Sequence, residues 1–340
     1  MNISHNFWLN AWYGKSKWIY FLLPFSWLFQ LTSALRKYFL VHFFQQHFEV
    51  PIVVVGNISV GGTGKTPLII ALVNHLKQHG HMPGVISRGY GGIAPHYPYV
   101  LDQNTLVTES GDEPLLIFKS THCQVCVAPD RSTAAAKLIE LGCTIILSDD
   151  GLQHYRLGRA IEIVVIDGSR SFGNKQLLPV GPLRESVSRL KSVDMIVINN
   201  QQQTLTDINH QKQFSMKIQP LFWRNLVTEE IVHTDNFITS GKLNAVAGIG
   251  NPQRFFKTLQ DMKIEFSSYS FDDHHQFSPA DFEMFGDDIV AMTEKDAVKC
   301  KSFAKANWYS LVVGAHLPED FWQNFESKIK SIRQIPGSIT

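Results

Sequence analysis

Short runs of apolar residues recur along the middle of the chain and predict buried strands. They lie at residues 52–56, 83–87, 123–128, 143–150, 161–167 and 195–199. Residues 66–80 and 131–141, which lie between some of these runs, have the apolar spacing of helices instead. Strands that alternate with helices are typical of a doubly wound, mostly parallel sheet. The pattern therefore predicts an α/β fold.

The pattern changes after the last of these strands. Residues 201–207 are polar, and residues 214–226 have the character of extended linking structure. A second succession of strand, glycine turn and helix begins at residues 244–259. A chain of 340 residues exceeds the size at which a single core stops growing. We therefore expect a core domain over residues 49–215 and a smaller α/β domain over residues 216–340, preceded by a helical segment at residues 1–48.

The N-terminal segment is unusually aromatic. Residues 1–50 hold 15 of the 39 aromatic residues, and residues 18–35 carry no charge. Basic residues flank this stretch on both sides, namely Lys15, Lys17, Arg36 and Lys37. Such flanks favour a helix lying in the headgroup region of a membrane, while a buried core helix and a marginal membrane span remain alternatives. No small-residue cleavage site follows the apolar stretch, so a signal peptide is not expected.

Composition narrows the function. The chain has 31 basic and 30 acidic residues, a balance that argues against a general nucleic-acid binder. Four cysteines in 340 residues indicate a reducing compartment. Cys123 and Cys126 have a spacing that could suggest a metal or redox site, but on a strand this odd separation places the two thiols on opposite faces. We expect structural cysteines.

A phosphate-binding loop is the sharpest motif. SVGGTGKT follows the strand at 52–56 and opens the helix at 66–80, as a Walker A loop does. Its glycines allow backbone N–H groups to face phosphate oxygens at a helix N-terminus, with Lys65 reaching the β- and γ-phosphates. A chance glycine-rich turn is the alternative. The loop predicts a P-loop NTPase-like core with nucleotide contacts at Ser59, Val60, Gly61, Gly62, Thr63, Gly64, Lys65 and Thr66.

The strand at 143–150 ends in two acidic residues. Asp149 and Asp150 lie where ligands bind an open α/β sheet, although a turn with two solvated aspartates would look the same. One of them, together with the Thr66 hydroxyl, is expected to hold Mg²⁺. The chain has no N-K-x-D or T-K-x-D guanine signature, so ATP is preferred over GTP.

Ordered motifs along nearly the whole chain resemble those of the tetraacyldisaccharide 4′-kinases of lipid A biosynthesis. They are VGNISVGGTGKTP, SRGYGG, SGDEP, APDR, SDDGLQH, LLPVGPLRE, AGIGNPQRFF, DDHHQF and TEKDAVK. The resemblance implies transfer of the ATP γ-phosphate to the 4′-hydroxyl of a tetraacyldisaccharide 1-phosphate, which forms lipid IVA. It also implies work at the cytoplasmic face of the bacterial inner membrane, as a peripheral or monotopic protein.

The same resemblance implies catalytic residues. An aspartate–histidine pair serves the family as proton acceptor, which points to Asp112 of SGDEP and a histidine of DDHHQF, with His274 favoured over His275. Adjacent histidines are otherwise more often loop residues or metal ligands. Five further residues could contact phosphates or form surface ion pairs, namely Arg88, Arg131, Gln153, His154 and Arg184.

Two functions of other classes compete with a lipid kinase. Partition-type ATPases also carry GGTGKT, but they place a lysine where this chain has Val60, and they lack the second domain. A binding module without turnover would not need Lys65, Thr66 and both aspartates. The kinase interpretation requires an acylated disaccharide substrate and a membrane surface, and no obligate protein partner or nucleic acid is evident.

Overall fold

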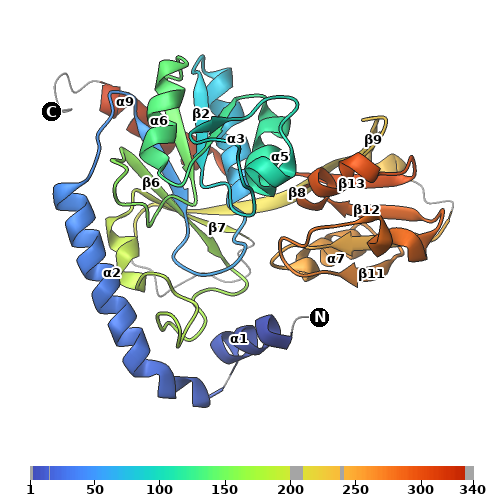
Figure 1. Cartoon of the computed structure of the whole chain (residues 1–340), viewed down its shortest axis with the longest axis horizontal. Helices are drawn as coiled ribbons and strands as arrows, with labels where there is room; N and C mark the ends of the chain where they lie inside the picture. Colours follow the sequence, from blue (N-terminus) through green and yellow to red (C-terminus); the bar gives the residue numbers. More distant parts are fainter. Residues whose placement is uncertain (1–2, 15, 200–209, 238–240, 334–340) are drawn as a thin grey trace.

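A computed structural model describes residues 3–14, 16–199, 210–237 and 241–333. Thirteen strands in this part of the chain form one continuous sheet, in the order β11-β10-β12-β13-β8-β7-β6-β1-β5-β2-β4-β3, with β9 paired to β8. The polar stretch at 201–207 and Lys15 lie outside the described residues. Figure 1 shows two lobes joined by the long strand β8.

The first lobe is built on the apolar runs of the sequence. Its strands are β1 (Ile52–Gly56), β2 (Pro83–Ser87), β3 (Tyr99–Val100), β4 (Gln124–Val127), β5 (Ile145–Asp149), β6 (Ile161–Asp167) and β7 (Met195–Asn199). All neighbours from β7 to β4 are parallel, and β3 closes that edge antiparallel. Every residue of β1, β2, β5, β6 and β7 is buried, as expected for strands covered on both faces.

Helices cover both faces of this sheet. The helices of the lobe are α3 (Lys65–Gln78), α4 (Val107–Ser110), α5 (Asp112–Thr121) and α6 (Arg131–Glu140), with the 3₁₀ helix η2 at Val187–Ser192. α3 and α5 supply apolar side chains to one hydrophobic cluster, and α6 supplies them to the cluster on the other face. Cys123 belongs to the first cluster and Cys126 to the second, so the two buried thiols lie on opposite faces as predicted.

The second lobe continues the sheet. Its strands are β9 (Ile231–His233), β10 (Leu243–Ala247), β11 (Ser267–Ser270), β12 (Ile289–Thr293) and β13 (Trp308–His316). Its helices are α7 (Pro252–Asp261) and α8 (Glu294–Cys300), with 3₁₀ turns η3 (Thr234–Asn236), η4 (Pro279–Phe285) and η5 (Lys301–Phe303). Aromatic side chains of α7 pack on one face of this part of the sheet, and those of η4 pack on the other.

Strand β8 (Gln213–Asn225) belongs to both lobes. Its first residues pair in parallel with β7, and the rest pair antiparallel with β13. Pro220 lies at a register shift in the β13 ladder, a position at which a strand tolerates a proline. The segment expected to be linking structure is therefore extended but fully integrated into the sheet.

The C-terminal helix α9 (Glu319–Arg333) returns to the first lobe. Phe321, Phe325 and Ile329 enter the same cluster as α3. The predicted boundary at residue 215 falls inside β8, and the division into domains stays a prediction.

The N-terminal segment packs outside the sheet and the helices of the two lobes (Figure 1). It contains α1 (Ile3–Tyr13), the 3₁₀ helix η1 (Trp18–Leu22) and α2 (Leu23–Phe43), which runs along the side of the first lobe (Figure 1). Residues 18–43 form an apolar helical stretch, and only 11% of its most apolar part is buried. The segment is therefore not a core helix. The segment is anchored near its turn, where Ala11 and Ile19 are buried with Val180. The Ser26 hydroxyl there donates to the Leu177 carbonyl at 3.0 Å.

Candidate active site

The phosphate loop lies between β1 and α3, as its motif requires. Gly64 precedes the first residue of α3 with φ of 95°, a conformation that favours glycine. A Cβ at Gly64 would lie 2.4 Å from the Asn199 side-chain nitrogen, which donates to the Thr63 carbonyl at 2.9 Å. Asn57 donates to the Ser59 carbonyl at 2.7 Å. The loop is therefore held from β1 on one side and from the end of β7 on the other.

Asp149 and Asp150 lie at the mouth of the same sheet edge. Lys65 Nζ lies 3.4 Å from Asp150 Oδ1, and Arg184 donates to Asp150 Oδ2 at 2.9 Å. Burial would raise the pKa of Asp150, but Lys65 and Arg184 outweigh it and hold the pKa well below the usual range. Asp150 is therefore ionised and positions Lys65.

Asp149 is in a different electrostatic environment although it is the next residue. It is buried, and burial together with the Glu113 carboxylate raises its pKa, against the opposing charge of Lys65. The Ser87 hydroxyl donates to Asp149 Oδ2 at 3.3 Å, while Asp149 Oδ1 is buried with no hydrogen-bond partner among the described residues. An unpartnered buried carboxylate oxygen beside a phosphate loop is the chemistry that a divalent cation satisfies.

Asp112 and His274 come together across the two lobes. Asp112 is the first residue of α5 and is buried, whereas His274 belongs to the loop after β11. His274 Nδ1 donates to Asp112 Oδ2 at 2.9 Å, and the Tyr90 ring lies 5.1 Å from the imidazole. The hydrogen bond to Asp112 is the largest cause that raises the pKa of His274. Burial opposes ionisation of Asp112, but His274 and Lys295 lower its pKa overall.

His275 takes no part in this contact. Its Nε2 lies 3.4 Å from Asp281 Oδ2, and its ring packs against Phe271 and Phe277. The geometry therefore agrees with the preference for His274, whose catalytic role stays a prediction.

Lys295 of the sequence motif TEKDAVK connects the two lobes beside the Asp112–His274 pair. Lys295 Nζ lies 3.0 Å from Glu113 Oε1, 3.5 Å from Asp273 Oδ1 and 3.9 Å from Asp112 Oδ2. These carboxylates raise the pKa of Lys295 against the effect of burial. Lys295 thus joins the start of α5 to the loop that carries His274.

Asp296 of the same motif positions a glycine loop of the second lobe. Its buried carboxylate accepts from the Gly248 backbone N–H at 3.0 Å. Further along that loop, a Cβ at Gly250 would lie 3.0 Å from Asp273 and 3.4 Å from the backbone nitrogen of Gly62. The second lobe therefore reaches the phosphate loop itself, a contact that no local pattern could predict.

The remaining polar candidates mostly support the loops around the aspartates. Arg131 is buried and donates to the backbone carbonyls of Asp149 and Asp150 at 2.9 and 3.0 Å. Gln153 donates to the Asn57 carbonyl at 3.1 Å, and burial lowers the pKa of His154 to about 4. Arg88 is exposed at the end of β2.

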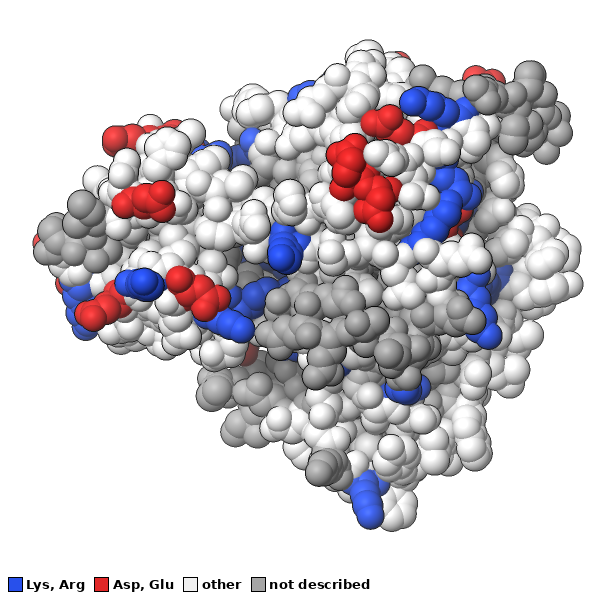
Figure 2. Space-filling view, turned by 180° about the vertical axis from the view of Figure 1, so that it is seen from behind, with Lys and Arg blue, Asp and Glu red and all other residues white. Residues whose placement is uncertain are grey.

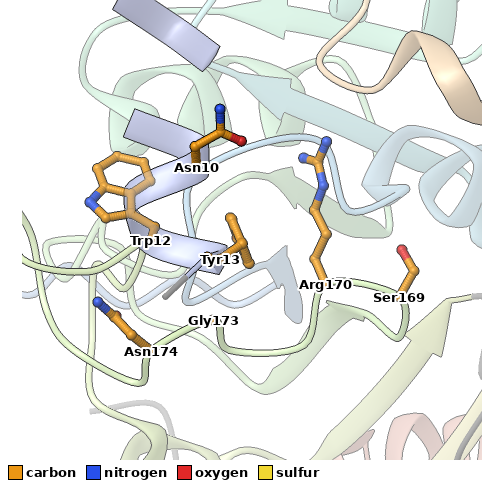
Figure 3. Close-up of a pocket in the computed structure, with 8 residues that line it drawn as sticks. Asn10, Trp12, Tyr13, Ser169, Arg170, Gly173 and Asn174 are labelled. Carbon is orange, nitrogen blue, oxygen red and sulfur yellow. The ribbon is translucent and has the colours of Figure 1, made fainter. Parts of the chain in front are cut away.

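A polar cavity of about 440 Å³ opens between α1 and the loop after β6 (Figure 3). Arg170 lies at one end, 5.9 Å from the Tyr13 ring, and a Cβ at Gly61 would lie 3.6 Å from its guanidinium. The cavity is lined by Asn10, Trp12, Tyr13, Gly14, Ser169, Arg170, Gly173 and Asn174. No sequence motif predicts this cavity, because its walls come from segments far apart in the chain.

Known proteins with similar sequences are kinases that act on an acylated disaccharide. A sequence model described as tetraacyldisaccharide-1-P 4′-kinase matches residues 18–330. The chain belongs to this kinase family. A tetraacyldisaccharide 4′-kinase of Legionella pneumophila (strain Corby) is 46% identical over 317 residues, covering 93% of this chain and 95% of the relative. One from Hahella chejuensis is 42% identical over 332 residues, covering 95% and 96%.

A solved structure of the family is also similar. LpxK from Aquifex aeolicus in complex with ATP superimposes with a TM-score of 0.77 at 27% identity, covering 92% of this chain and 99% of that one. The resemblance, the fold class and the kinase function predicted from the sequence are confirmed. Membership of the tetraacyldisaccharide 4′-kinase family favours the kinase over the partition ATPase and the binding module.

Proposed function

We propose that this chain transfers the γ-phosphate of ATP to the 4′-hydroxyl of a tetraacyldisaccharide 1-phosphate, with the Asp112–His274 pair as proton acceptor. The relatives named tetraacyldisaccharide 4′-kinases and the ATP complex of LpxK support the substrates. The observation that carries the mechanism is the 2.9 Å hydrogen bond between side chains 162 positions apart, at a site where both lobes meet the phosphate loop.

The residues divide the work of phosphoryl transfer between them. The N–H groups of residues 59–66 and the Lys65 ammonium hold the phosphates and offset the charge that develops on them. The acceptor hydroxyl must lose a proton as it attacks phosphorus. An imidazole held by a buried carboxylate is well suited to receive that proton, because the carboxylate fixes its orientation and stabilises its charged form. Lys295 keeps the carboxylate side of the pair in place.

The residues at the sheet edge fit Mg²⁺. Thr66 lies in the first turn of α3, and the buried Asp149 has an oxygen with no hydrogen-bond partner in the described part of the chain. We infer that Thr66 and Asp149 hold the ion, with Asp150 acting through Lys65 and Arg184. When bound, Mg²⁺ neutralises phosphate charge.

We further propose that α1 and α2 rest on the cytoplasmic face of the inner membrane, peripherally or as a monotopic anchor. Phe21, Phe25 and Trp27 are 87%, 61% and 64% exposed. Figure 2 shows that the end of the molecule formed by the N-terminal helices is mostly white with a few blue residues and almost no red. An apolar face with basic flanks suits an anionic lipid surface. Lys37 contributes less than expected, because its ammonium lies 4.9 Å from the Tyr155 ring centre.

The cavity beside α1 supplies a path for the acceptor. Its position between the membrane-facing segment and the phosphate loop places Arg170 where a polar headgroup would pass. We infer that the acyl chains stay with the lipid and that the sugar enters here.

A thin-layer assay of ATP-dependent phosphorylation of the acylated disaccharide tests the proposal. We expect a product with one more phosphate, formed with wild-type protein and ATP. ATP hydrolysis without that product would instead indicate an ATPase switch, and neither activity would indicate a binding module. Repeating the assay across Mg²⁺ concentrations with Asp149→Ala should show a higher Mg²⁺ requirement, whereas an unchanged requirement would remove Asp149 from the metal site.

A further inference from the structure

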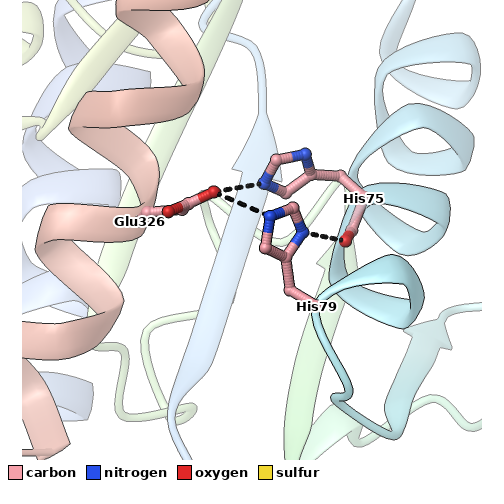
Figure 4. Close-up of side chains that lie close together, drawn as sticks. All are labelled: His75, His79 and Glu326. Carbon is pink, nitrogen blue, oxygen red and sulfur yellow. Dashed lines mark hydrogen bonds and ion pairs between the residues drawn. The ribbon is translucent and has the colours of Figure 1, made fainter.

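Two histidines and a glutamate converge at the end of α3 that is remote from the phosphate loop. His75 lies on α3, His79 follows the last residue of the helix, and Glu326 lies on α9 (Figure 4). His75 Nε2 and His79 Nε2 each lie 3.1 Å from the same oxygen, Glu326 Oε1. The three atoms lie within 4.8 Å of one another. Lys65 is ten positions before His75, which places this cluster about 15 Å along the helix from the phosphate loop.

The orientation of both imidazoles is fixed by other contacts. His79 Nδ1 donates to the His75 carbonyl at 2.8 Å, and a zinc-bound histidine commonly donates its second nitrogen in this way. The His75 ring stacks on Trp322 of α9, with ring centres 4.2 Å apart and planes 15° apart. Each ring therefore presents Nε2 to the same point.

The protonation pattern suits a cation better than an ion pair. Without a metal, both Nε2 atoms would have to donate to one carboxylate oxygen, and His79 would need protons on both nitrogens. With a metal, both imidazoles bind as neutral ligands and the ionised Glu326 supplies the negative charge. Its other oxygen lies 3.5 Å from Lys330 Nζ.

We propose that His75 Nε2, His79 Nε2 and Glu326 Oε1 form a binding site for a divalent zinc-like cation. Two histidines one helical turn apart with a carboxylate from a second element are a zinc ligand set, and a water completes four-coordination. The observed 3.1 Å spacings are close to the edge of a tetrahedron with bonds of about 2.0 Å, roughly 3.3 Å. The metal ties the C-terminal helix to the helix that begins at the phosphate loop.

The test is titration of the metal-free full-length protein with Zn²⁺ by calorimetry, with Co²⁺ absorption as a check of tetrahedral geometry. We expect one equivalent to bind tightly and to raise the melting temperature. Glu326→Gln, which preserves side-chain volume, and His79→Ala should each weaken this binding by at least about tenfold, since even loss of an outer-shell partner costs that much. His233→Ala, exposed on β9, is the matched control and should bind like wild type.

Two results would overturn the site. One is the absence of a tight Zn²⁺ equivalent in wild type. The other is equal Zn²⁺ affinity in wild type, Glu326→Gln and His79→Ala. Neither result depends on kinase activity, so failure of this site and failure of the proposed function are distinguishable.

Discussion

The phosphate loop and the Asp112–His274 pair differ in how much of the chain is needed to build them. Eight consecutive residues form the loop, which follows β1 and ends in the first turn of α3. The pair joins α5 of the first lobe to a loop of the second lobe, and Lys295 of α8 holds that junction from a third segment through its contacts with Asp112 and Asp273. A local motif can therefore bind nucleotide by itself, whereas proton transfer needs the two lobes in register. Nucleotide binding and catalysis should respond to different mutations.

The largest loss of activity should come from a substitution in the phosphate loop. Lys65→Ala removes the mobile cation of the phosphate loop, and loss of such a preorganised charge costs roughly 3–4 kcal/mol of transition-state stabilisation. We expect kcat for phosphate transfer to fall by about 10²- to 10³-fold, measured with radiolabelled ATP. Lys137→Ala, at an exposed ion pair on α6, is the control. Lys65→Ala activity within threefold of wild type would remove the loop from the reaction.

The junction between the lobes should give the next largest effect. His274→Ala should lower kcat by roughly 10²-fold, within the range for positioned acid–base groups, while the KM for ATP changes little. His275→Ala is the neighbouring control and should stay near wild type, because His275 contacts Asp281 in its own lobe. If His275→Ala were the damaging change, the assignment within the pair would be wrong.

The pH dependence of kinase activity also tests His274 as the proton acceptor. A proton acceptor works when it is deprotonated, so activity should fall as pH drops through the pKa of the pair. Asp112 raises the pKa of His274 above its usual 6.5, which places this acid limb above pH 6.5. In His274→Ala the imidazole is gone, so the acid limb that its titration produces should be lost. A limb at the same pH in wild type and variant would assign it to another group.

The buried strands and the phosphate loop could be predicted from the sequence, because each depends on residues that are close together in the chain. β1, β2, β6 and β7 have the predicted bounds, because strands buried on both faces need continuous apolar runs. Gly64 and Lys65 are placed by the same strand–loop–helix context. Contacts between segments that are far apart in sequence could not be predicted, because no local pattern encodes them. The packing of α9 beside α3, the Gly250–Gly62 approach and the partners of Lys295 all join segments far apart in sequence.

The N-terminal segment gives the smallest expected effect on chemistry and a measurable effect on location. Phe21→Glu replaces an 87% exposed side chain, and burial of a phenylalanine contributes about 1.5–3 kcal/mol. Vesicle binding should weaken at least about tenfold, with an unchanged melting temperature, and high salt should release part of the wild-type protein. Met284→Glu, 71% exposed in the second lobe, is the control. Equal vesicle binding by both variants would mean that the apolar stretch at residues 18–43 does not face the membrane at Phe21.

We propose that Asp112 and His274 act as one proton acceptor assembled across the two lobes. A double-mutant cycle on kcat for 4′-phosphorylation distinguishes one shared acceptor from two independent groups, using Asp112→Asn, His274→Ala and the double variant, each at saturating ATP. Residues that act as a unit are strongly non-additive, so the double variant should be about as slow as the slower single variant. Losses that multiply in the double variant would show two independent groups and would contradict the shared acceptor.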